Sequence, residues 1–179
     1  MRIQIALCGA LMALASPCFA APEQFTQGPV ITGFGAVAKV DSDLPSPAGM
    51  DYKVAFDVKS GKAGERSTGI DGAARLMNML AASGVPISKI HPAIVLHHAA
   101  LFDVTTDARY GKEYGGAPNP NVDLVRQLIA KGVPIYVCGQ SAVWANVEKS
   151  ELLPGVKMAL SAMDAHAILQ RQGYSLNPF

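Results

Sequence analysis

The alternation of apolar and polar positions becomes regular at residue 51 and continues almost to the end of the chain. The segment "YKVAFDV" (52–58) alternates and is rich in β-branched and aromatic residues, which predicts a strand. Helical and strand patterns then follow one another in turn. Helices are predicted over 71–84, 119–132, 141–150 and 163–173, and strands over 52–58, 92–99, 134–139, 156–162 and 174–179.

The ends of these segments carry matching signals. Asp71 and Asn119 are predicted helix caps, and Ser161 with Asp164 three residues later is typical of a capped helix start. The joints "LAASGVPI" (80–87) and "LIAKGVPI" (128–135) each pass from a helix through a glycine to a strand. Alternating strands and helices predict one α/β domain over 51–179, a three-layer α/β/α fold with a mostly parallel five-stranded sheet.

The first twenty residues have the pattern of a secretory signal peptide. Arg2 precedes an apolar run over 5–15, and small residues stand near Ala20, where we expect cleavage. The apolar run is too short to span a membrane. A lipid anchor at Cys18 is a weaker alternative, because Pro17 precedes it. The expected location is the periplasm.

An irregular arm is predicted over 21–50. Its second half, "DSDLPSPAGM" (41–50), is rich in Pro, Ser and Asp and has no lasting period. The segment "VITGFGAVAKV" (30–40) is compatible with a short edge strand or with a segment that docks on a neighbour.

Charge and cysteine content exclude several classes of function. Cleavage at Ala20 removes one of the 15 Lys and Arg residues, Arg2, which leaves 14 against 14 Asp and Glu. A net charge near zero argues against nucleic acid and against an anionic membrane surface as partners. Cleavage also removes Cys8 and Cys18, so Cys138 has no partner for an internal disulfide.

Cys138 is the leading candidate for chemistry. It ends a predicted strand just before a helix, whose free N–H groups favour a thiolate, the nucleophilic form. Gly139 would permit a sharp turn and leave room for a reactant, and Gln140 and Ser141 would donate hydrogen bonds to a sulfur anion. The alternative is that Cys138 only fills space in the core, as free cysteines often do.

Other candidates lie on neighbouring segments. His97 and His98 end the second strand, so one of them should face the same edge as Cys138, as a base, a metal ligand or a structural residue. Arg109 lies in the glycine-rich stretch 103–120, which is predicted to be an irregular lid. Arg109 or Lys112 of this stretch would draw an anionic reactant to the site. Asp57 and His166 are weaker candidates: Asp57 would hold a helix or loop in place, and His166 would be structural or exposed. No phosphate-binding loop or dinucleotide fingerprint is present.

The carboxyl-terminal third of the chain resembles a known family. "GVPIYVCGQSA" (132–142), "LLPGVKMALSAM" (152–163) and "LQRQGYSLNPF" (169–179) are similar to the DsrE/DsrF-like sulfur-relay proteins, and the signal peptide matches their exported branch. The resemblance implies a Rossmann-like α/β/α fold and a homo-oligomer, commonly a trimer or hexamer. It also implies a cysteine that accepts sulfane sulfur as a persulfide, and Cys138 occupies that position.

The leading hypothesis is therefore a periplasmic carrier that binds or transfers sulfane sulfur through Cys138, without cofactor or metal. Its partners would be a small sulfur compound or a sulfur-accepting protein. Whether it turns over as a sulfurtransferase-like enzyme is left open. One alternative is a non-catalytic, homo-oligomeric module that binds a small molecule or a partner. The other is a metal-binding protein that uses Cys138, a histidine and Met163.

Overall fold

The structure is a computed structural model that describes residues 24–178. The predicted signal peptide over 1–20, with Cys8 and Cys18, lies outside the described residues. Among the described residues, no helix is long and apolar enough to cross a membrane.

A five-stranded sheet forms the centre of the molecule. Its strands are β1 (Tyr52–Val58), β2 (Ile90–Leu96), β3 (Ile135–Cys138), β4 (Lys157–Ala159) and β5 (Ser175–Asn177). They lie in the order β4-β3-β2-β1-β5, and all four pairings are parallel. The parallel pairing follows from the helical connection between each strand and the next. The predicted three-layer α/β fold is confirmed.

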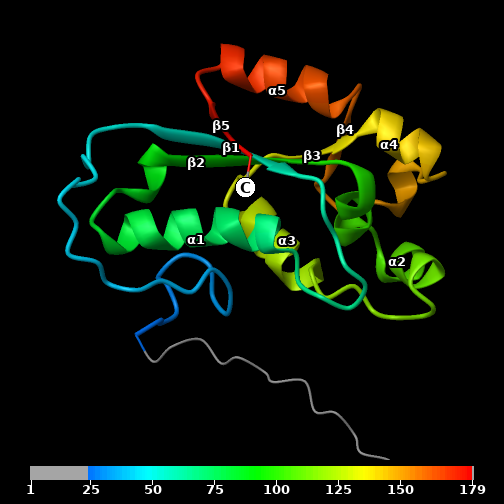
Figure 1. Cartoon of the computed structure of the whole chain (residues 1–179), viewed down its shortest axis with the longest axis horizontal. Helices are drawn as coiled ribbons and strands as arrows, with labels where there is room; N and C mark the ends of the chain where they lie inside the picture. Colours follow the sequence, from blue (N-terminus) through cyan, green and yellow to red (C-terminus); the bar gives the residue numbers. More distant parts are fainter. Residues whose placement is uncertain (1–23, 179) are drawn as a thin grey trace, which may run out of the picture.

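Helices cover both faces of the sheet. In Figure 1, α1 (Thr68–Ala82) and α3 (Val122–Ala130) lie below the sheet and α5 (Ala162–Arg171) lies above it. The short helices α2 (Asp107–Glu113) and α4 (Gly139–Trp144) lie together at one end of the molecule. Residues 24–178 also contain three 3-10 helices: η1 (Ile87–Lys89), η2 (His98–Val104) and η3 (Lys149–Glu151).

The two faces of the sheet are packed differently. Large side chains such as Met77, Ile94 and Leu128 fill the layer between the sheet and the α1 and α3 helices. On the α5 face the buried residues are mostly small: Ala55, Ala93, Val95, Cys138, Ala162, Ala165 and Leu169. Cys138 therefore belongs to the layer between the sheet and α5. This layer is thin, because small side chains fill it.

Several predicted helix starts shift in the structure. Ser67, not Asp71, is the N-cap of α1, and Asp71 in its first turn accepts a hydrogen bond from the N–H of Gly35. Asn121, not Asn119, is the N-cap residue of α3, although its side chain makes no capping hydrogen bond. Asn119 lies two residues earlier: its Oδ1 accepts from the N–H of Asn121, and its Nδ2 donates to the carbonyl oxygens of Asp103 and Thr105.

Other predicted segments have different lengths or structure. Helix α4 starts at Gly139 and stops at Trp144, and β2 ends at Leu96 because η2 begins at His98. The predicted irregular stretch 103–120 contains the whole of α2 and is not a structureless lid. The cap at Ser161 is confirmed, since its hydroxyl accepts a hydrogen bond from the N–H of Asp164.

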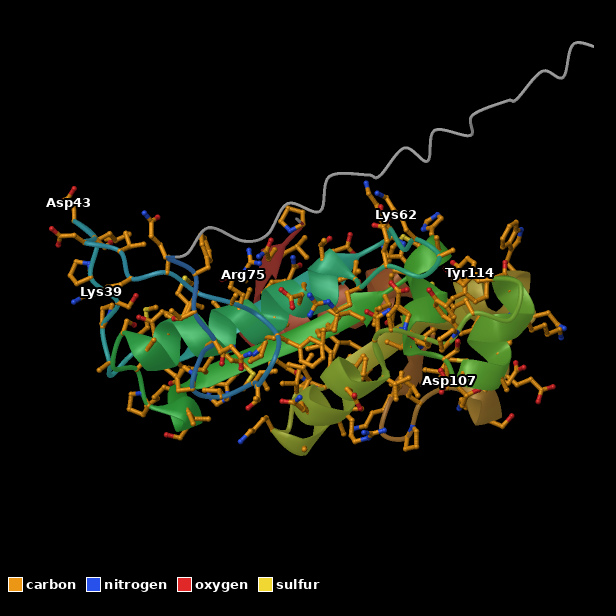
Figure 2. All side chains as sticks on the ribbon, turned by 90° about the horizontal axis from the view of Figure 1, so that it is seen from below. Lys39, Asp43, Lys62, Arg75, Asp107 and Tyr114 are labelled. Carbon is orange, nitrogen blue, oxygen red and sulfur yellow. The ribbon has the colours of Figure 1, made fainter. Side chains whose placement is uncertain are left out.

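The arm packs on its own domain. Within residues 24–50 the backbone pairing is a single antiparallel bridge between Thr26 and Val37. The fully buried Asn78 of α1 holds the arm: its Oδ1 accepts from the N–H groups of Val30 and Ile31. Its Nδ2 donates to three arm carbonyls. Figure 2 shows the arm residues Lys39 and Asp43 at the opposite end of the molecule from Tyr114 and Asp107.

Replacing Asn78 with Ala is expected to destabilise the protein by about 3 kcal/mol, because buried arm N–H and C=O groups lose their partner. Urea unfolding of the chain measures this. Gln127→Ala is the matched control: Gln127 also makes two hydrogen bonds to the arm, with the N–H and C=O of Thr32, but these are exposed. Gln127→Ala is expected to lower the free energy of unfolding by less than about 1 kcal/mol. Equal costs for both variants would contradict this account of the docking.

Candidate functional site

The carboxyl ends of β1, β2 and β3 meet at one edge of the sheet. Asp57 is the second-last residue of β1, His97 follows β2, and Cys138 ends β3. The N–H of His97 donates to the carbonyl of Val58 at 3.0 Å, which extends the parallel pairing beyond the end of β2. A cavity of about 1270 Å³ opens at this edge and is lined by all three residues. Ligands of parallel α/β sheets commonly bind at such an edge.

The environment of Cys138 favours its thiolate. The residue is 6% exposed. Burial by itself would raise the pKa of the Cys138 thiol, but hydrogen bonds from the Ser141 side chain and from the N–H groups of Ser141, Ala162 and Gln140 outweigh it. The pKa of the thiol is therefore lowered from its ordinary value. A thiolate that accepts four hydrogen bonds in a cavity is stabilised and still open to a small reactant.

Gly139 acts in a different way from the sequence prediction. A β-carbon at this position would lie 2.6 Å from the carbonyl oxygen of Ala159. Glycine is therefore needed because the start of α4 approaches the end of β4, and Gly139 is not among the residues that line the cavity. Its role is to position Cys138, and it does not make room for a reactant.

Gln140 and Ser141 both line the cavity beside Cys138. Gln140 Nε2 donates to the carbonyl of Leu160 at 3.3 Å, so its side-chain amide is turned toward the end of β4. The hydrogen bond from Gln140 to the sulfur of Cys138 comes from its backbone N–H. Ser141 Oγ accepts from the N–H of His98 at 3.2 Å, which leaves the hydroxyl hydrogen for the sulfur. Ser141 thus connects the Cys138 and His98 positions.

Three histidines and one carboxylate lie along the same wall of the cavity. His166 Nε2 lies 2.8 Å from Asp57 Oδ1, within hydrogen-bond distance. His97 Nε2 lies 3.1 Å from the same oxygen but is not aligned as an ordinary hydrogen bond. Nδ1 of His97 and Nδ1 of His98 are 2.7 Å apart, which is hydrogen-bond distance. The cluster joins β1, the start of η2 and α5, so it depends on the tertiary fold.

Arg109 is not part of this site. Its side chain is 4% exposed; one guanidinium nitrogen lies 3.2 Å from Glu113 Oε2 and another donates to the carbonyl of Ala145. It does not line the cavity, and neither does any other Lys or Arg of residues 24–178. The sequence expectation that Arg109 attracts an anionic reactant is corrected: buried in α2, it holds α2 against the end of α4.

The cavity walls are mainly apolar. Phe102, Tyr114, Trp144 and Met163 line it. Sequence reasoning missed Phe102, Tyr114 and Trp144 as site residues, because their shared position depends on how η2, α2 and α4 pack. Asp57 and His166, only weak candidates in the sequence, prove to be paired. Within residues 24–178, no group of three or more His, Cys, Asp or Glu side chains is arranged to hold a metal ion.

Fold and site together define a class: a parallel α/β/α protein with a hydrogen-bonded cysteine in a cavity at the carboxyl edge of its sheet. The model of the DsrE/DsrF-like family matches residues 53–178, and the chain belongs to that family. The predicted resemblance is confirmed.

Solved structures agree with this fold. A protein of unknown function, MTH1491 from Methanobacterium thermoautotrophicum, is 16% identical with a TM-score of 0.53, covering 72% of this chain and 100% of its own. The ychN protein from E. coli is 15% identical with a TM-score of 0.52, covering 72% of this chain and 99% of its own. At these identities the likeness concerns the fold alone. Among curated protein sequences, none matches this chain significantly.

Replacing Ser141 with Ala is expected to raise the pKa of the Cys138 thiol, because the side-chain hydrogen bond to the thiolate is lost. The thiolate fraction near neutral pH then falls, and alkylation by iodoacetamide slows several-fold. The pH dependence of the Cys138 alkylation rate measures the change. The control is Ser150→Ala, which removes an exposed hydroxyl bonded to Glu148. An unchanged profile in the Ser141 variant would show that this hydroxyl does not stabilise the anion.

Proposed function

We propose that the protein carries sulfane sulfur on Cys138. The thiolate attacks the outer sulfur of a donor R–S–S–H, the new Sγ–S bond forms, and the S–S bond of the donor breaks. The leaving R–S⁻ keeps the electron pair of that bond and takes a proton from solvent. The product is a Cys138 persulfide. No separate oxidant is needed, because the transferred sulfur has the same oxidation state in the donor and in the Cys138 persulfide.

The observation that supports this proposal is the hydrogen-bond set around Cys138. Thiol–disulfide exchange proceeds through the thiolate, and a lowered thiol pKa increases its population near neutral pH. The same donors stabilise Cys138 as the leaving group when the sulfur moves on to an acceptor. Family membership makes sulfur relay the expected reaction class.

The lining of the cavity favours a particular kind of donor. Apolar side chains dominate it, and in the part of the chain that the structure describes no Lys or Arg lines it. A dianionic donor such as thiosulfate would be desolvated there without a cation to pair with. We therefore propose a persulfide with a small organic substituent as the donor, delivered either free or on a partner protein.

The direct test is sulfur loading followed by intact-mass measurement. After exposure to benzyl persulfide, the folded chain is expected to gain one sulfur atom, about 32 Da, as persulfidation requires. Cys138→Ser is expected to lose that gain and keep its fold by circular dichroism. Loading that persists in this variant would contradict the assignment. A wild-type thiol that stays unreactive until the protein unfolds would instead favour a non-catalytic binding module.

We also propose that the protein is an exported homo-oligomer. The signal-peptide pattern at the start of the sequence supports export to the periplasm. Trp144 and Met163 line the cavity and are largely exposed, and so are Val143 and Leu160, which are close to them in sequence. An exposed cluster of this kind is typical of an interface. A second copy of the chain would cover it and shield the cavity from bulk water.

Replacing Trp144, which is 91% exposed, with Asp is expected to shift the oligomer to monomer, because a carboxylate would be buried at the interface. Light scattering during gel filtration measures the mass. Leu44→Asp is the matched control, since Leu44 is 84% exposed but lies in the arm. A wild-type chain that runs as a monomer at all accessible concentrations would contradict the proposal.

A further inference from the structure

We propose that His98 is the catalytic base that deprotonates the thiol to which Cys138 hands its sulfur. This inference rests on the proposed function and concerns the discharge step. A persulfide on Cys138 can be attacked only by a thiolate, and ordinary alkyl thiols are mostly protonated near neutral pH. The site therefore needs a proton acceptor beside Cys138.

His98 is held next to the cysteine by its backbone. Its N–H donates to Ser141 Oγ, and the Ser141 side chain in turn bonds the sulfur of Cys138. The side chain of His98 is exposed and lines the cavity. Ser141 is therefore the single residue that links the backbone of His98 to the sulfur of Cys138 through hydrogen bonds.

The backbone of His98 is unusual. Its φ angle is +51°, in the left-handed region that residues other than glycine seldom adopt. Such strain is found mainly at functional sites, where it orients a side chain. At this position it turns the chain from the end of β2 into η2 and directs the imidazole of His98 toward that of His97, with ring centroids 4.7 Å apart.

The neighbours of His98 define which of its nitrogens is free. Nδ1 of His98 lies 2.7 Å from Nδ1 of His97, so these two nitrogens share one hydrogen bond. We assign the shared proton to His98, which leaves the lone pair of its imidazole on Nε2. Nε2 of His98 has no hydrogen-bond partner among residues 24–178.

The discharge step begins with a proton transfer. Nε2 of His98 takes the proton of the acceptor R′–SH, and R′–S⁻ attacks the outer sulfur of the Cys138 persulfide. The R′S–S bond forms and the Cys138 Sγ–S bond breaks. Cys138 keeps the electron pair as a thiolate within its hydrogen-bond set. His98 then releases the proton to solvent, and the products are R′–S–S–H and the original site.

The chemistry of the acceptor supplies the test. A catalytic base is needed for an alkyl thiol such as 2-mercaptoethanol, but not for a nitroaryl thiol that is already ionised at neutral pH. Asp57, His97, Glu113, Tyr114, Cys138 and His166 are the other titratable residues that line the cavity. Both acceptors are therefore compared at one neutral pH, so the ionisation of these residues is the same in both measurements.

The experiment loads the mature chain, from which cleavage at Ala20 has removed Cys8 and Cys18, with benzyl persulfide. Loss of the sulfur is followed by intact mass after adding either acceptor. His98→Asn is the main variant, because asparagine tolerates a positive φ. His98→Gly removes the backbone strain as well as the base. His91→Gln is the matched control: His91 also lies beside an aspartate, with Nε2 3.5 Å from Asp51 Oδ1, but it stands near the amino end of β2, away from the cavity.

His98→Asn and His98→Gly are both expected to slow discharge to 2-mercaptoethanol by roughly 100-fold, the lower end of the effect of a catalytic base. Discharge to the nitroaryl thiol should keep its wild-type rate, and His91→Gln should match wild type with both acceptors. Wild-type rates in the His98 variants, or equal slowing with both acceptors, would overturn the assignment. Failure of the wild-type chain to load sulfur is a different result: it removes the proposed function, and this inference with it.

Discussion

The parallel pairing of β1, β2 and β3 is the constraint on which the site depends. Because the three strands run in the same direction, their carboxyl ends bring Asp57, His97 and Cys138 to one edge, although these residues are far apart in sequence. The close approach of Gly139 to the carbonyl of Ala159 fixes the point where β3 ends and α4 begins. A side chain at Gly139 would push this junction away from β4 and move the thiol with it.

Two opposed effects act on Cys138, and their balance determines its chemistry. Burial disfavours a charged sulfur, while hydrogen bonds from Ser141, Ala162 and Gln140 favour it, and the hydrogen bonds prevail. The small residues of the α5 layer bring the first turn of α5, with Ala162, close to the sulfur. An otherwise space-filling cysteine is thereby made a candidate nucleophile.

Much of the fold is visible in the sequence, because local signals and tertiary structure agree. The strand ending at Cys138 and the cap at Ser161 follow directly from residue pattern. Asn119 has the chemistry of a cap, but α3 begins two residues later, so its Oδ1 accepts from the N–H of the N-cap residue Asn121, which lies before the first turn. Arg109 is a surface cation by residue type, yet α2 buries it against Glu113. The pairing of Asp57 with His166 spans 109 residues and depends on α5 covering the sheet, which no local pattern reveals.

The most direct measurement is an ultraviolet titration of the Cys138 thiolate in the folded chain. Absorbance of the thiolate is followed against pH, and the spectrum of Cys138→Ser is subtracted to remove every other contribution. The account predicts a midpoint below the ordinary value of a free cysteine, about 8.5. A midpoint at or above that value would mean that burial outweighs the hydrogen bonds and that Cys138 is a core residue of the sheet.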